Sequence, residues 1–92
     1  MSLVRRRVIV SGRVQGVFFR DSCQRQAATA GVQGWVRNTN SGDVEAVFEG
    51  EADAVEKMVA WCRVGPSRAT VTSVRVAEEE PEGLTNFRVA GY

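Results

Sequence analysis

Histidine is absent from this 92-residue chain, and cysteine and proline occur only twice each. Without histidine, the Ser-His-Asp and Cys-His arrangements of nucleophilic catalysis and a histidine phosphoenzyme are excluded. A zinc site would have to combine Cys23 and Cys62 with carboxylates, and no metal-ligand spacing supports one. We therefore expect no metal and no metal catalysis, and we expect both cysteines to be buried, reduced thiols rather than a disulfide.

An excess of charge of one sign and long apolar runs are also missing. The net charge is +1, whereas non-specific binding to a phosphate backbone usually requires a strongly basic protein. We interpret the basic run Arg5-Arg6-Arg7 as solvated side chains at the start of a strand. No apolar run is long enough for a membrane span or a signal peptide. We expect a cytoplasmic protein with neither a nucleic-acid nor a membrane partner.

The phosphate-binding motifs of nucleotide enzymes are missing as well. No lysine completes a Walker pattern after Gly12 and Gly16, and no G-x-G-x-x-G fingerprint is present. Cys23 is a conceivable phosphatase nucleophile, but no arginine follows it where a phosphate loop around a thiolate would need one. The apolar spacing around Cys23 favours a place in the core instead.

The length suits a single domain over residues 1–92. Alternation predicts a first strand over 7–11, with Val8 and Val10 on its buried side. A helix is predicted after Arg20 and ends at Gly31, because one stripe of apolar residues has helical spacing. That stripe consists of Phe19, Cys23, Ala27 and Ala30.

The remainder of the chain predicts a hairpin, a second helix and two more strands. Residues 32–50 contain two strands around the turn residues Asn40-Ser41-Gly42. Residues 51–64 have a helical apolar stripe and end at Gly65-Pro66. Residues 69–79 and 85–92 are predicted strands; the first carries Val74 and Val76 on one face, and the second carries Phe87 and Val89.

The predicted order is βαββαβ plus a short C-terminal strand. Two helices on one face of a mainly antiparallel sheet would bury both helical stripes, as in the ferredoxin-like split βαβ sandwich. The predicted fold class is therefore α+β. We expect Trp35 and Trp61 to pack on the core, and we interpret Arg13 and Arg37 as ordinary surface charge.

The stretch "GRVQGVFFR" at residues 12–20 connects the first strand to the first helix. Glycines permit a turn whose N–H groups point inward, and the helix N-terminus adds unpaired donors and the positive end of its dipole. Arg20 adds a planar fork suited to two phosphoryl oxygens. This stretch is consistent with anion binding or with a common turn beside a surface arginine. Asn38, at the end of the second strand, is either a turn residue or a group that holds water.

Two motifs resemble the signatures of the acylphosphatase family. Residues 12–20 match its G-x-V-Q-G-V-x-[F/Y]-R pattern. Residues 34–50 match its second pattern, through Gly34-Trp35-Val36-Arg37-Asn38 followed by Gly42, Val44 and Gly50. Both signatures are complete, and the resemblance extends over essentially the whole chain.

The resemblance implies a cofactor-free enzyme that hydrolyses small-molecule acyl phosphates to a carboxylate and inorganic phosphate. By position in the motifs, Arg20 would bind the phosphate and Asn38 would orient the attacking water. The backbone of five residues would complete the phosphate-binding loop: Gln15, Gly16, Val17, Phe18 and Phe19. We expect the protein to act as a monomer.

The residue chemistry suits this substrate. A carboxylate leaving group, whose conjugate acid has a pKa of roughly 4, departs without a general acid, and phosphoryl transfer demands mainly positioning and charge stabilisation. Two other functions share this fold. One is a non-catalytic anion-binding or regulatory domain, which the asparagine signature disfavours. The other is an RNA-binding sheet, which is disfavoured because the first strand offers no aromatic residues for base stacking.

Overall fold

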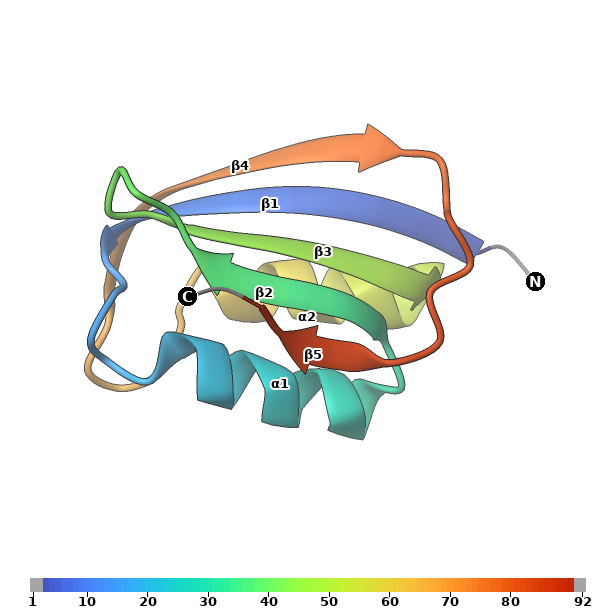
Figure 1. Cartoon of the computed structure of the whole chain (residues 1–92), viewed down its shortest axis with the longest axis horizontal. Coiled ribbons are helices and arrows are strands. Elements are labelled where there is room, and N and C mark those ends of the chain that lie inside the picture. Colours follow the sequence, from blue (N-terminus) through green and yellow to red (C-terminus); the bar gives the residue numbers. More distant parts are fainter. Residues whose placement is uncertain (1–2, 91–92) are drawn as a thin grey trace.

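The structure, a computed structural model, describes residues 3–90 (Figure 1). The order along the chain is β1, α1, β2, β3, α2, β4 and β5. The elements are β1 (Leu3–Arg13), α1 (Phe19–Ala30), β2 (Gln33–Asn38), β3 (Val44–Glu51), α2 (Ala52–Cys62), β4 (Thr70–Glu79) and β5 (Phe87–Val89). This confirms the predicted order, although β1 is longer at both ends than the predicted strand over 7–11.

The five strands form one sheet in the order β4-β1-β3-β2-β5. β3 pairs antiparallel with both β1 and β2, and β1 pairs antiparallel with β4. Each helix therefore connects two strands that have a third strand inserted between them, which is the split βαβ arrangement. β5 pairs parallel with β2 at the sheet edge, so the sheet is mixed, and the predicted ferredoxin-like α+β fold is confirmed.

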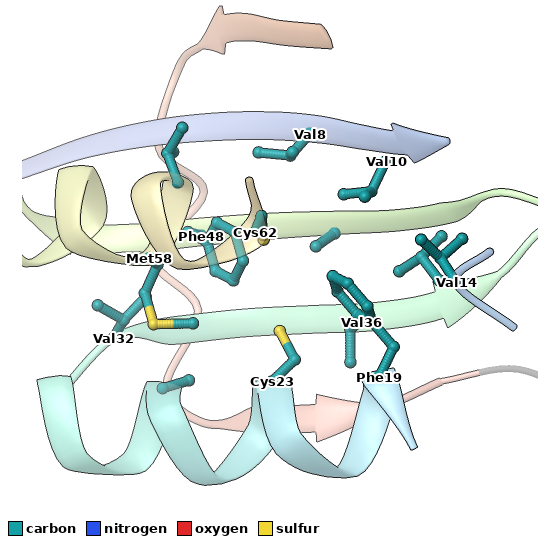
Figure 2. Packing of buried hydrophobic residues seen from close by; sticks show 14 of the residues in the cluster. Val8, Val10, Val14, Phe19, Cys23, Val32, Val36, Phe48, Met58 and Cys62 are labelled. Carbon is teal, nitrogen blue, oxygen red and sulfur yellow. The ribbon is translucent and has the colours of Figure 1, made fainter. Parts of the chain in front are cut away.

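Both helices pack on one face of the sheet, with α2 against β1 and β3 and α1 against β2 and β5. The two predicted helical stripes enter the core between these layers, where Phe19, Cys23 and Met58 point at the sheet (Figure 2). Val8 and Val10 are fully buried beneath the helices, as the alternation predicted. Neither helix in residues 3–90 has the length and apolar character to cross a membrane.

The strand β4 is less buried than its two valines led us to expect. Val74 packs against the core, but Val76 is 40% exposed. β4 is an edge strand that pairs only with β1 within the described sheet, and the helices do not extend far enough to cover its outer part. Contacts between α2 and β4 are correspondingly few.

The open face of the sheet carries an ion-pair network where we predicted solvated arginines. Arg5 is 3% exposed; it donates from Nη1 to Glu49 Oε2 at 2.7 Å and from Nε to Glu79 Oε1 at 2.8 Å. Arg7 contacts Glu45 and Glu79. Alternation places Arg5 and Arg7 on the face opposite the helices, where carboxylates of β3 and β4 enclose them.

Trp35 is also on this open face, so the prediction that it covers the main core is wrong. The guanidinium carbon of Arg7 lies 5.6 Å from the centroid of the Trp35 ring, within the range of a cation–π contact. Trp61 does pack as predicted, because its ring meets that of Phe19 with centroids 5.1 Å apart.

Candidate active site

The loop between β1 and α1 and the turn between β2 and β3 meet at the same end of the sheet (Figure 1). Gln15 joins them, because its side-chain amide donates to the backbone oxygens of Thr39 at 2.8 Å and Asp43 at 2.9 Å. These bonds connect the glycine-containing loop to the segment that directly follows Asn38. Two segments that are far apart in the sequence are thus joined by hydrogen bonds at one end of the sheet.

A bulge in β1 starts this loop. The β1–β4 register shifts between Ser11 and Gly12, and Gly12 has a φ of 123°. A Cβ atom there would lie 2.2 Å from the backbone oxygen of Thr70, so only glycine allows β4 to approach this closely. The bulge ends the regular strand and turns the chain towards the helix.

Two residues of the loop adopt left-handed backbone conformations. Gly16 has a φ of 74°, which glycine adopts readily, and Phe18 has a φ of 64° and is the one non-glycine residue with positive φ in the described chain. This conformation costs a non-glycine residue about 1–2 kcal/mol. The flanking side chains of Val17 and Phe19 are 3% and 2% exposed, and burying both of them holds Phe18 in this conformation.

The helix α1 begins at this loop without a side-chain cap. Phe18 is the N-cap residue, and its side chain makes no hydrogen bond to the N–H groups of the first turn. Those N–H groups have no acceptor within the helix, and they carry the positive end of the helix dipole. A helix terminus of this kind is suited to hold an anion.

A cleft of about 290 Å³ opens at the start of α1. Its walls contain Val14, Gly16, Phe18, Phe19, Arg20, Asp21 and Asn38. Arg20 lies in the first turn of the helix and is half-buried, whereas Asn38 ends β2 and is 7% exposed. The fold therefore brings a guanidinium, a carboxamide and a helix N-terminus to one small concave surface.

The cleft does not contain every residue that the motifs suggested. Gly16, Phe18 and Phe19 line it together with Arg20 and Asn38. The side chain of Gln15 bonds to the backbone of Thr39 in the neighbouring turn, and that of Val17 packs in the core. The sequence reasoning missed Val14 and Asp21 as lining residues. Val14 is the first valine of the first motif, and Asp21 follows its arginine, so their positions in the sequence could have indicated both.

The cysteines occupy the core rather than the cleft. Cys23 and Cys62 are free thiols and both are fully buried. A hydrogen bond with Cys62 and then burial raise the pKa of Cys23 well above its usual value, whereas a nucleophilic thiol needs a lowered pKa. The interpretation of Cys23 as a core residue is therefore supported over that of a nucleophile.

Within residues 3–90, no three histidine, cysteine, aspartate or glutamate side chains come together as possible metal ligands. The carboxylates of the open face accept hydrogen bonds from arginines and backbone N–H groups. Glu49, for example, accepts bonds from the N–H groups of Glu82, Gly83 and Leu84.

Arg37 points away from the cleft, to the open face, where it pairs with Glu45 at 2.6 Å. Its side chain is 45% exposed. The interpretation of Arg37 as surface charge is consistent with this placement.

The fold and the cleft together define a small α+β protein with a helix N-terminus, an arginine and an asparagine at one concave surface. The sequence model of the acylphosphatase family matches residues 6–89. An acylphosphatase of Gloeobacter violaceus is 55% identical over 86 residues, which cover 94% of this chain and 92% of the relative. One of Thermococcus kodakarensis is 52% identical over 91 residues, covering 99% of this chain and 100% of the relative. The chain belongs to the acylphosphatase family, which confirms the predicted enzyme class.

Solved structures agree with this assignment. The acylphosphatase of Coxiella burnetii superposes with a TM-score of 0.92 at 41% identity, covering 96% of this chain and 93% of that protein. The Bacillus subtilis acylphosphatase gives a TM-score of 0.91 at 36% identity, with coverages of 95% and 98%. The fold described above is therefore that of the family's solved members.

Proposed function

We propose that the protein hydrolyses acyl phosphates without a metal, releasing a carboxylate and inorganic phosphate. The observation that carries this proposal is that Arg20 and Asn38, from different elements, line the same cleft at the N-terminus of α1. In this proposal, 1–92 is one acylphosphatase-like domain that acts as a cytoplasmic monomer.

In the proposed mechanism, the phosphoryl group lies against the helix N-terminus. The guanidinium of Arg20 bonds two of its oxygens, and the backbone N–H groups of residues 15–19 contribute further donors. These groups offset the negative charge of the phosphoryl oxygens in the transition state. Because the donors are held in place before the substrate arrives, little reorganisation accompanies the reaction.

The water is oriented by the side chain of Asn38. It attacks phosphorus in line with the P–O bond to the acyl group; that bond breaks, and its electron pair leaves with the carboxylate. The proton of the water passes to an oxygen of the substrate's own phosphoryl group, so neither a general base nor a covalent phosphoenzyme is required. In a loose transition state the nucleophile needs little activation, so the main requirement is that it is correctly positioned.

The cleft favours this substrate over a phosphomonoester. An alkoxide leaving group would need a general acid or a metal ion, and the ionisable side chains of the cleft are Arg20 and Asp21. Arginine stays protonated in proteins. A carboxylate, with a conjugate-acid pKa of roughly 4, leaves unaided.

The test is release of phosphate from benzoyl phosphate in excess chelator. We expect wild-type turnover to resist chelation, and Asn38→Ala to lose about 10²- to 10³-fold in kcat while still being inhibited by inorganic phosphate. The matched control is Asn40→Ala, because Asn40 is exposed in the neighbouring turn and should leave kcat unchanged.

A second variant tests the arginine. Arg20→Lys should weaken both turnover and inhibition by phosphate, because an ammonium cannot form the two parallel bonds of the fork. Arg25→Lys, an exposed position on the same helix, is the control. Phosphate binding that depends on Arg20, without any phosphate release by the wild type, would instead indicate the non-catalytic anion-binding domain.

A further inference from the structure

The ring of Phe18 lies at the cleft but makes none of the contacts proposed for the phosphoryl group. Phe18 is 63% exposed and lines the cleft. Four large hydrophobic residues of the described chain are exposed: Leu3, Phe18, Val64 and Val76. Of these four, Phe18 is the one that lines the cleft. An exposed aromatic ring beside a binding cleft is more informative than a scattered surface leucine or valine.

The backbone explains why this ring faces solvent. Val17 and Phe19 are buried on either side of it, and the left-handed conformation at Phe18 directs its side chain away from the core between them. The loop therefore keeps a strained residue with an unburied ring at the cleft. Core packing does not account for a phenylalanine here, since the ring buries little surface in the protein itself.

The rest of the cleft leaves few groups to contact the acyl half of a substrate. Arg20 and the helix N-terminus are assigned to the phosphoryl group, and Asn38 to the water. Val14 and Phe19 are 1% and 2% exposed, and Gly16 has no side chain. The exposed side chains that remain in the wall are those of Phe18 and Asp21.

We propose that Phe18 is a specificity-determining residue whose ring contacts the acyl group, and that Asp21 disfavours a second negative charge there. The preferred substrates are then acyl phosphates with an aromatic or other apolar, uncharged acyl group. This inference rests on the proposed function, because it concerns the acyl half of the same substrate. A ring contact contributes through burial of apolar surface and through the favourable geometry of aromatic pairs.

The test compares kcat/KM for benzoyl phosphate with kcat/KM for acetyl phosphate. Phe18→Ala should lower the benzoyl-to-acetyl ratio about five- to tenfold, whereas Phe18→Tyr, which keeps the ring, should retain it. The ratio is the readout because any damage to the shared phosphate-binding loop affects both substrates alike. Val64→Ala, which truncates an exposed apolar side chain outside the cleft, should leave the ratio unchanged.

The charge is tested with a matched substrate, 4-carboxybenzoyl phosphate. Asp21→Asn should raise kcat/KM for this substrate relative to benzoyl phosphate by about two- to fivefold at low salt, and the difference should shrink as salt screens the two carboxylates.

An unchanged benzoyl-to-acetyl ratio in Phe18→Ala, or an equal fall in Phe18→Tyr, would overturn the role of Phe18. Equal effects of Asp21→Asn on both aromatic substrates would overturn the role of Asp21. In either case wild-type turnover would persist and the proposed function would stand. A wild type that releases no phosphate from any of these substrates would overturn the proposed function itself, and this inference with it.

Discussion

Arginine side chains lie in two different surroundings in two regions of this molecule. On the open face of the sheet, Arg5 is enclosed by Glu49 and Glu79 and is almost inaccessible. At the end of the sheet, Arg20 lines an accessible cleft beside a helix N-terminus. The side-chain chemistry is the same, but the surroundings differ: two carboxylates bond to the buried Arg5, whereas Arg20 shares the wall of an open cleft with Asn38, Asp21 and the first residues of α1.

If Arg20 binds phosphate as proposed, a guanidinium is structural or functional according to what the fold places opposite it. Cross-strand register puts Arg5 opposite Glu49 on β3 and Glu79 on β4. A phosphate could not displace these carboxylates without leaving buried charges unpaired. Glu49 in turn fixes the connection between β4 and β5 by accepting three backbone N–H bonds.

Among the changes that test this difference between the open face and the cleft, Glu49→Ala should have the largest effect, a loss of stability. The change removes the carboxylate nearest a buried guanidinium and three backbone bonds, so we expect a loss of about 3–5 kcal/mol in the free energy of unfolding. This corresponds to a fall in Tm on the order of 20 °C. Thermal denaturation measures the loss, and kcat/KM measured well below Tm should stay at the wild-type value.

The matched control is Glu78→Gln. The Glu78 side chain is 82% exposed and lies 3.7 Å from Arg6, so its loss should change stability by no more than about 0.5 kcal/mol. If Glu49→Ala lowered kcat/KM while leaving Tm unchanged, the division between a structural face and a functional cleft would be wrong.

The next effect concerns Gln15, which connects the loop to the β2–β3 turn. Gln15→Glu replaces a donor to two carbonyl oxygens with a carboxylate that would repel them, so we expect kcat/KM to fall about tenfold or more, with a smaller fall in Gln15→Ala. Inhibition by inorganic phosphate should weaken in parallel, because the loop that holds it is displaced. Steady-state kinetics in which the two variants behave like the wild type would show that this connection does not position the site.

A smaller effect is expected from acid. Hydrogen bonds from Arg7 and then Arg5 lower the pKa of Glu79 from 4.5 to about 2. Burial alone would raise the pKa of Glu49, but bonds from the Glu82 N–H group and from Arg5 outweigh it and lower that pKa. A group with a lowered folded-state pKa stabilises the protein above its unfolded-state pKa, and this contribution disappears as the pH falls.

The urea midpoint should therefore decrease between about pH 4.5 and pH 2. In Glu79→Gln this decrease should be shallower, because one of the titrating groups has been removed. An identical pH dependence in the variant and the wild type would exclude Glu79 as a source of the acid sensitivity.

The smallest effect is expected at Arg37. Its partly exposed pair with Glu45 should contribute no more than about 0.5–1 kcal/mol, and its side chain is directed to the open face. Arg37→Gln should accordingly change kcat/KM less than twofold across a range of salt concentrations. A large, salt-dependent fall in kcat/KM would show that Arg37 attracts the anionic substrate. The open face would then contribute to activity as well as to stability.

Much of the fold was predictable because its signals are local. The helical stripes of α1 and α2, the alternation in β1 and β3 and the stop at Gly31 each depend on residues a few positions apart. The left-handed Gly31 at the end of α1, with a φ of 73°, agrees with its predicted role. The resemblance of the two motifs to the family signatures likewise indicated Arg20 and Asn38.

The wrong or incomplete predictions share a physical cause. The arginine run and Trp35 were misplaced because the open face has a network of its own, assembled from strands that are distant in sequence. The parallel pairing of β5 with β2 and the anchoring role of Gln15 were not predicted either. Each depends on which strands become neighbours.

Short-range periodicity and residue spacing were thus enough to indicate the elements, their order and the family signatures, because helices and strands repeat over a few residues. The pairing of β3 between β1 and β2, in contrast, decides which arginines meet carboxylates and which one lines the cleft with Asn38. That outcome depends on the register between distant strands, where a shift of one residue would turn every side chain to the opposite face.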